Sequence, residues 1–305
     1  MARTYKIGSK GNVVKQIQTA LGIESDGVFG TETETAVKDF QLKHNLTVDG
    51  VVGEKTMEVL LPKNETKTNT NTLTSSIMTT FSKIVSKPVI EDYFLPKSQY
   101  INGIYNNDYI VLHHTAGHDS PKQVIDNWAK DAAGRVATEF VIGGQRSTDG
   151  RNIYDGKIVH AFPEKNQAYH IGNCGSSYMS VHSVGIEMCN MGWVKNGKSY
   201  VNSIVRPDQI ITLSEPFKGY TQWHKYSDAQ LKSLYSLLLY VANRDNIDLH
   251  EGLYKWINKE GVKAFDFHQD AYLGKCKGLI SHANIRKDKF DVFPQPELID
   301  LILSL

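Results

Sequence analysis

The sequence has 305 residues, of which 40% are hydrophobic and 22% charged, and its formal net charge at pH 7 is +1. This length predicts two domains, and the near-neutral charge argues against nucleic acid or an acidic lipid surface as a partner recruited by bulk charge. Three widely spaced cysteines, Cys174, Cys189 and Cys276, cannot form a disulfide framework, so we expect free thiols and a reducing compartment.

The first residues lack the apolar core of a signal peptide, and no stretch of the sequence is long and apolar enough to span a bilayer. We therefore expect synthesis in the cytoplasm without a signal peptide, and no membrane insertion.

Residues 1–62 are predicted to form a small all-α domain of three short helices. Apolar residues recur at helical spacing over 13–21, and Gly22 follows as a stop signal. A second helix is expected to begin at Thr31, whose hydroxyl can form a capping box with Glu34.

A third helix is expected over about 54–61, ended by Pro62. The turns before the second and third helices repeat each other, as Asp26-Gly27-Val28-Phe29-Gly30 and Asp49-Gly50-Val51-Val52-Gly53. An Asp-Gly pair supplies a tight turn with a residue at positive φ. The match of five residues at equivalent positions indicates an internal duplication.

Residues 63–87 are predicted to be a linker, because they begin with a polar, low-complexity tract. Apolar residues at helical spacing within this segment favour a short amphipathic helix there. These residues are Leu73, Ile77, Phe81, Ile84 and Val85.

Residues 88–305 alternate strand and helix patterns, which predicts an α/β domain with a mixed sheet flanked by helices. Strands are expected over 109–112, 136–142, 158–162 and 184–188. Helices are expected from the Ser120 cap to Trp128, and from a capping box of Ser227 and Gln230. Residues 194–222 and 250–275 fit no clear element and are interpreted as insertions over the core.

Several polar residues have the pattern of a catalytic metal site. The strand over 109–112 leads into His113 and His114, of which only one can face a given site. With His282 and Asp291 near the C-terminus, one of these histidines completes the three ligands of a catalytic zinc ion. Each of these residues alone is more commonly structural, so the hypothesis depends on the combination.

Glu187 follows an apolar run and a glycine, which is unusual because an unpaired buried carboxylate is costly. It is either a salt-bridged or solvent-facing edge residue, or a carboxylate that takes a proton from water at the metal.

The motifs of residues 1–62 resemble a peptidoglycan-binding domain of the three-helix type. They are Gly8-Ser9-Lys10-Gly11, Ile17-Gln18, Phe40-Gln41 and the two repeated turns. The resemblance implies non-covalent attachment to the bacterial wall. Most of these residues are expected to build turns and core.

The chain from about Tyr109 to Pro294 resembles the zinc-dependent N-acetylmuramoyl-L-alanine amidases of the type-2 kind, a family that includes peptidoglycan recognition proteins. The motifs are, in order, Val111-Leu112-His113-His114-Thr115-Ala116-Gly117, Phe140-Val141-Ile142, Ala168-Tyr169-His170-Ile171-Gly172, Val184-Gly185-Ile186-Glu187, and the segment from His282 to Asp291. The resemblance implies an amidase-type domain over 88–305, Zn²⁺ as cofactor, and cleavage of the bond between N-acetylmuramic acid and L-alanine of the stem peptide.

The resemblance also implies roles for single residues. His113, His282 and Asp291 would be the zinc ligands, with His113 preferred to His114 because the family's ligand is the first histidine after the strand. Glu187 would be the general base, and Lys289 would stabilise the oxyanion.

Two further residues are assigned to substrate binding. His170 would line the substrate groove, and Thr138 stands where many members have a tyrosine. The sequence also departs from the family's usual motifs at Ala283-Asn284 and Val292-Phe293. His250 and His268 are reserve candidates for metal ligands, although a solvated or structural role is favoured for both.

Two other functions are open: a binding-only recognition protein, and a wall enzyme of another bond specificity. The filled ligand positions favour an enzyme over a binding-only protein. A glycosidase needs two opposed carboxylates, and no second acid pairs convincingly with Glu187. A wall-binding domain without a signal peptide resembles a bacteriophage endolysin, which would act on the wall from the periplasm after release. We expect a monomer whose partner is bacterial peptidoglycan.

Overall fold

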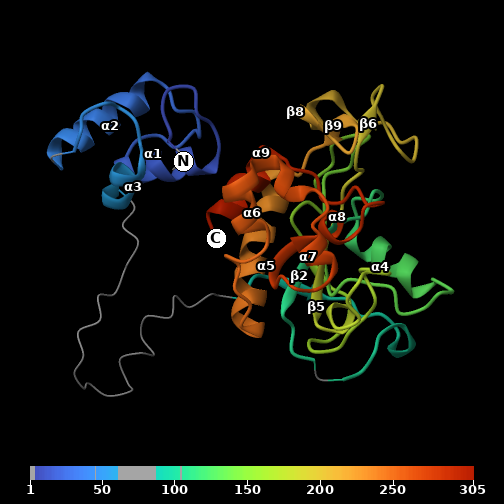
Figure 1. Cartoon of the computed structure of the whole chain (residues 1–305). Helices are drawn as coiled ribbons and strands as arrows, with labels where there is room; N and C mark the ends of the chain where they lie inside the picture. Colours follow the sequence, from blue (N-terminus) through green and yellow to red (C-terminus); the bar gives the residue numbers. More distant parts are fainter. Residues whose placement is uncertain (1–3, 45, 61–86, 104) are drawn as a thin grey trace, which may run out of the picture. The chain divides into compact units, whose positions relative to one another are not determined.

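The structure is a computed structural model that describes residues 4–44, 46–60, 87–103 and 105–305 (Figure 1). The chain divides into two compact units, and the division falls between the second and third of these ranges. Three predictions fall almost wholly outside the described residues. They are the linker over 63–87, its short helix, and the end of the third helix at Leu61 and Pro62.

The N-terminal unit contains the three predicted helices. They are α1 (Asn12–Leu21), α2 (Thr31–Lys43) and α3 (Glu54–Leu60). Gly22 ends α1 in the left-handed conformation, with a φ of 72°. The predicted capping box at Thr31 is wrong. Gly30 has the extended backbone of the cap position, so Thr31 is already helical and its side chain forms no capping hydrogen bond.

The internal repeat is present as two equivalent sets of hydrogen bonds around buried glutamines. The amide nitrogen of Gln18 lies within hydrogen-bond distance of Asp26 Oδ1 (2.7 Å), Val28 O (3.1 Å) and Thr33 Oγ1 (3.0 Å), and Gly27 N donates to its oxygen (2.8 Å). The same contacts join Gln41 to Asp49 (2.8 Å), Val51 (3.0 Å), Thr56 (3.2 Å) and Gly50 (2.9 Å). Gly27 and Gly50 have positive φ, as the Asp-Gly turns predict.

The second unit contains the predicted mixed sheet. Its strands, in spatial order, are β1 (Ile90–Asp92), β4 (Ile158–His160), β3 (Phe140–Ile142), β5 (Ser183–Met188), β2 (Tyr109–His114) and β10 (Gly278–Ser281). Only the pair of β3 and β4 is antiparallel. Both β2 and β5 are buried along their whole length, as continuous apolar runs predict. The predicted strand over 136–142 is shorter, with Val136 in an isolated bridge to Tyr169.

Helices cover both faces of this sheet. They are α4 (Pro121–Ala129), α5 (Asp228–Asp245), α6 (Leu253–Glu260), α7 (Gln269–Tyr272), α8 (His282–Ile285) and α9 (Pro296–Leu303). Leu234 and Leu238 of α5 pack in one core with Ile110 and Ile186, whereas Val124 of α4 packs on the other face. The predicted caps at Ser120 and Ser227 are confirmed. No helix of the described ranges has the length and apolar character to cross a bilayer.

The segments over 194–222 and 250–275, which fit no clear element in the sequence, do contain regular structure. Two hairpins are formed by β6 (Val194–Lys195) with β7 (Lys198–Ser199) and by β8 (Ile210–Phe217) with β9 (Tyr220–His224). The second region contains α6 and α7. These elements are short or pair only locally, and β8 is mostly exposed, so their sequence lacks a clear alternation of buried residues. The three cysteines are free thiols, as predicted.

Candidate metal centre

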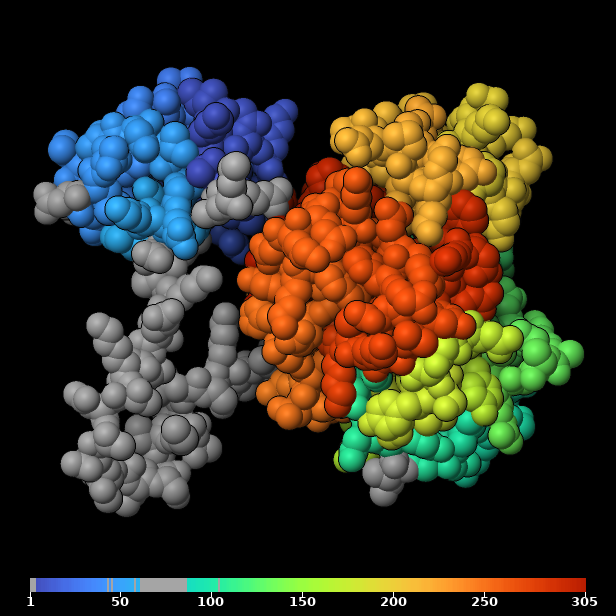
Figure 2. All heavy atoms as spheres, viewed as in Figure 1, coloured from blue at the N-terminus to red at the C-terminus, as the bar shows by residue number. Residues whose placement is uncertain are grey.

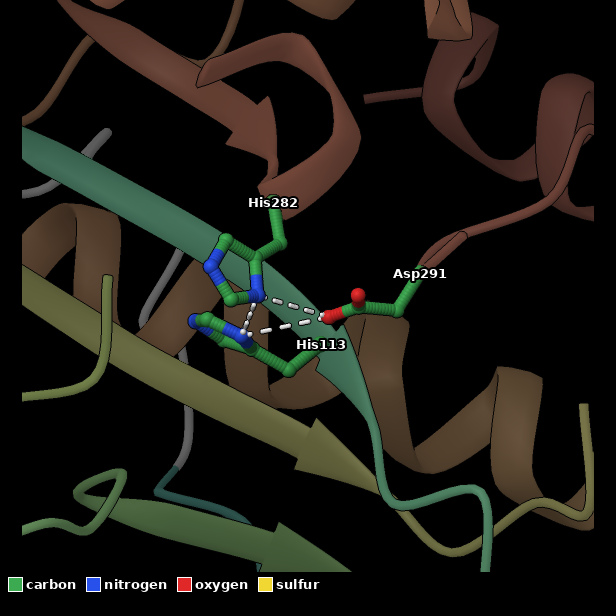
Figure 3. Close-up of side chains that lie close together, drawn as sticks. All are labelled: His113, His282 and Asp291. Atoms are coloured by element: carbon green, nitrogen blue, oxygen red, sulfur yellow. Dashed lines mark hydrogen bonds and ion pairs between the residues drawn. The ribbon is translucent and has the colours of Figure 1, made fainter. Parts of the chain in front are cut away.

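Three side-chain atoms from two distant parts of the chain meet at the carboxyl end of the central strands (Figure 3). His113 Nδ1 lies 3.0 Å from His282 Nδ1, and Asp291 Oδ2 lies 3.0 Å from His282 Nδ1 and 3.3 Å from His113 Nδ1. The predicted ligand residues are therefore brought together, and they form the one such group of potential ligands found among the described residues.

The sheet register explains how two of these side chains become neighbours. Strand β10 runs parallel to β2 and pairs Ser281 with Leu112, so His282 follows beside His113 at the same edge. The loop that supplies Asp291 is fixed by a hydrogen bond from Ala283 N to its carbonyl oxygen (2.7 Å). Asn284, one of the departures from the family motif, is buried, and its side chain accepts from Ser281 N (2.8 Å) at the start of α8.

Hydrogen bonds behind the group fix which nitrogen of each imidazole carries its proton. Ser183 Oγ donates to Met179 O (2.7 Å), so it accepts from His170 Nε2 (2.9 Å). His170 Nδ1 is then an acceptor, and His113 Nε2 donates to it (3.0 Å). His282 Nε2 donates to the Ile171 carbonyl (3.3 Å). Both Nδ1 atoms are left with lone pairs directed at Asp291.

This donor set fits a zinc ion. Two lone pairs and a carboxylate oxygen facing one another repel unless a cation lies between them. A tetrahedral zinc ion with bonds of about 2.0–2.1 Å has ligand atoms about 3.3 Å apart. The observed separations of 3.0–3.3 Å are close to that value. Outer hydrogen bonds from both histidines, one to a carbonyl and one to a polar side chain, are typical of metal ligands.

The electrostatics keep two of the ligands in the protonation states that a metal needs. Burial lowers the pKa of His113 to about 4, and the neighbouring His282 acts in the same direction. Burial of Asp291 opposes its ionisation, but the two imidazoles, led by His282, hold its pKa well below the usual range. His113 is therefore neutral and Asp291 ionised at neutral pH.

Glu187 lies on the same face of the sheet as His113, because β5 pairs these two residues in register. Its side chain is 9% exposed and faces a cavity of about 180 Å³, and no hydrogen bond of its carboxylate is found within the described ranges. Burial raises its pKa well above the usual value, Asp291 adds to this rise, and Lys289 opposes it. Such a carboxyl group can accept and return a proton near neutral pH.

Lys289 is the cation of this site. It is half-buried, two residues before Asp291, and its charge acts on the pKa values of both Glu187 and His113. In the part of the chain that the structure describes, its ammonium forms no hydrogen bond or ion pair, so it is available to a developing negative charge.

The two residues assigned to substrate binding both form hydrogen bonds within the protein. Both ring nitrogens of His170 are engaged as described above, and Thr138 is 2% exposed and donates to Phe140 O (3.0 Å). A Cβ atom on Gly185 would lie 2.8 Å from Thr138 and 3.0 Å from His170, so glycine allows both to pack against β5. Their contacts with substrate stay predictions.

The remaining histidines lie outside the metal group. His114 points to the opposite face of the sheet and lies 2.9 Å from the Tyr226 hydroxyl, which agrees with the preference for His113. His250 is exposed beside Asp248, and His268 is stacked on Trp256 with ring centroids 4.0 Å apart. The reserve candidates thus have the solvated and structural roles that were favoured.

A mixed sheet with a two-histidine, one-carboxylate group and a buried glutamate at its edge defines a candidate metallohydrolase. The family model of the N-acetylmuramoyl-L-alanine amidases matches residues 105–289, and a peptidoglycan binding domain model matches residues 10–60. The chain belongs to the N-acetylmuramoyl-L-alanine amidase family, and it carries a peptidoglycan-binding domain at its N-terminal side. A comparison of the sequence with curated proteins found no match.

Several solved structures are similar to parts of the chain. A fused zinc-dependent amidase, peptidase and peptidoglycan-binding domain protein from Clostridium acetobutylicum ATCC 824 is 43% identical over 23% of this chain and 32% of its own, with a TM-score of 0.20. The endolysin amidase LysCS from Clostridium intestinale URNW is 17% identical over 72% of this chain and 99% of its own, with a TM-score of 0.39. The amidase AmiD from E. coli is 20% identical over 48% of each chain, with a TM-score of 0.31.

The chain thus spans about a third of the length of the first of these proteins. The family assignment rests on the two family models.

Proposed function

We propose that the protein is a zinc-dependent amidase that hydrolyses the bond between N-acetylmuramic acid and the L-alanine of the stem peptide in peptidoglycan. The observation that carries this proposal is the convergence of His113, His282 and Asp291, with their lone pairs directed at one point. A group built only for structure would place a proton donor between such acceptors. Membership of the amidase family supplies the class of bond.

A bound zinc ion would act as a Lewis acid that polarises the scissile carbonyl and lowers the pKa of water. Glu187 takes the proton of the attacking water and later delivers it to the leaving nitrogen, a role that suits a buried carboxyl with a raised pKa. Lys289 places positive charge where the carbonyl oxygen becomes negative. Burial around Glu187 strengthens both interactions because little water screens them.

We further propose that the N-terminal unit anchors the enzyme to the wall, with peptidoglycan as both ligand and substrate. The match of residues 10–60 to the peptidoglycan binding domain model supports this role. A wall-binding unit beside a wall-cutting one suits a bacteriophage endolysin that acts on the host wall as a monomer.

The test is digestion of purified peptidoglycan by the full chain, with and without a zinc chelator, followed by mass analysis of the products. Stem peptides beginning in L-alanine, lost on chelation and restored by zinc, are expected. Intact muropeptides with new reducing sugar ends would mean a glycosidase, and zinc-replete protein that yields no product would favour a binding-only protein.

A further inference from the structure

Four aromatic rings form a continuous series that ends in the loop of Asp291, here called the aromatic row. Its members are Tyr200, Trp193, Tyr220 and Phe290. Successive ring centroids lie 6.1, 4.2 and 6.0 Å apart, and the two central rings are stacked with an interplanar angle of 8°. The row connects the hairpins of β6 to β9 with the loop that carries Asp291, and Figure 2 shows the gold hairpins against the red C-terminal segment.

The centre of the aromatic row packs against a buried ring, and its two ends are exposed to solvent. Trp193 forms a bridge with Trp223, a fully buried ring that also contacts Tyr220 at 6.3 Å. At the ends, Tyr200 is 55% exposed and Phe290 is 38% exposed. A folded chain rarely leaves such rings at the surface in a series unless the surface binds something.

One end of the row belongs to the loop that carries Asp291. Phe290, whose ring centroid lies 6.0 Å from that of Tyr220, stands between Lys289 and Asp291 in the chain. In the proposed substrate the scissile amide is attached to the lactyl group of a sugar. The sugar chain must therefore lie directly beside the metal centre, on one side or another.

A different surface suits the charged stem peptide. A cavity of about 470 Å³ shares Gly117 and His118 with the cavity at Glu187, and charged side chains contribute to its lining. It includes Asp119 and Arg146, which form an ion pair at 3.5 Å. Carboxylates and amines of a peptide find partners there, whereas the aromatic row offers none of these charges.

We propose that the aromatic row binds the glycan strand of peptidoglycan, an inference that rests on the proposed function. A pyranose ring has faces made of C–H groups, which carry partial positive charge, and an aromatic face is the negative part of its quadrupole. Packing of sugar on Tyr200 and Phe290 removes apolar surface from water on both partners. The hairpins interpreted as insertions thereby acquire a role in holding polymeric substrate.

The test compares Tyr200→Ala with Tyr200→Phe in the full chain, with the unsubstituted chain as the parent. The probe is soluble glycan strands stripped of stem peptides, and binding is measured by calorimetry. Loss of one aromatic contact is expected to weaken binding about five- to tenfold in Tyr200→Ala, while Tyr200→Phe, which keeps the ring, binds like the parent. Free stem peptide should bind equally to all three proteins.

The matched control is Tyr178→Ala, also in the full chain. Tyr178 is 48% exposed and stacked on His182 at 3.8 Å, and its hydroxyl contacts Asp108 just before the amino end of β2, away from the metal edge. Equal binding by Tyr200→Ala and the parent, or an equal loss in Tyr178→Ala, would overturn the proposal. Because binding is measured without turnover, failure of the amidase reaction in the wild-type chain is a separate result.

Discussion

His170 offers a direct test of how the metal centre is held. His170→Ala removes the one acceptor found for His113 Nε2 among the described residues. The imidazole of His113 can then rotate, or carry its proton on Nδ1, the nitrogen that faces Asp291. Loss of an outer partner of this kind typically lowers metal affinity about 10- to 100-fold, or about 1.4–2.8 kcal/mol. His282 keeps its own partner, the Ile171 carbonyl, so zinc binding should be weakened and not abolished.

The assay is competition for zinc between the full chain and a fluorescent chelator at neutral pH. His170→Asn places an amide oxygen near the position of Nδ1, so most of the affinity should return. His250→Ala is the control, since this histidine is exposed and lies beside Asp248 and Tyr254, outside the metal group. Zinc affinity of His170→Ala equal to that of the control, or no recovery in His170→Asn, would refute the role assigned to the hydrogen-bond series.

Three further variants test other parts of the structure. Glu187→Gln should retain zinc and lose activity. The pKa of Glu187 is raised above its usual value of 4.5, so ionisation of this carboxyl makes the folded wild-type protein less stable as the pH rises past that value. Metal-free Glu187→Gln should therefore have the same melting temperature as the wild type at pH 4 and a higher one at pH 7. Lys289→Met should lower kcat by about 10²–10³ with zinc content unchanged, which steady-state kinetics and metal analysis can check. Gln41→Leu leaves the Gly50 amide unpaired, so it should destabilise the N-terminal unit by about 1–3 kcal/mol in urea, and wild-type stability would argue against the buried network.

The residues that could be predicted from the sequence are those whose placement depends on local pattern. The apolar run before His113 predicts a buried strand, and a residue at the end of such a strand lies at the sheet edge. The caps at Ser120 and Ser227 follow from short-range hydrogen bonds, and the structure contains both. His282 and Asp291 are suggested by their residue types and by the family resemblance, because no local rule brings them to His113.

The parts that could not be predicted depend on contacts between distant segments. Ser183 is an ordinary first residue of a strand until β5 brings it against His170, and Gly185 carries no sign of the close approach it permits. The strands β6 and β7 have two residues each, too few for any alternation to be visible. The capping box expected at Thr31 shows a further limit of prediction from sequence. The cap residue and the first helical residue are neighbours in the chain, and in the structure Gly30, with its extended backbone, occupies the cap position.

The metal group also has a consequence for the stability of the chain. His113 and His282 are separated by 169 residues, so an ion held by both acts as a cross-link that closes a very long loop. Strand β10, which delivers His282, is the last strand of the sheet and depends on β2 for its ladder of hydrogen bonds. A bound ion would hold this outer strand in place. Withdrawal of zinc would then do more than stop turnover, because it would loosen the C-terminal part of the sheet and expose it to proteolysis.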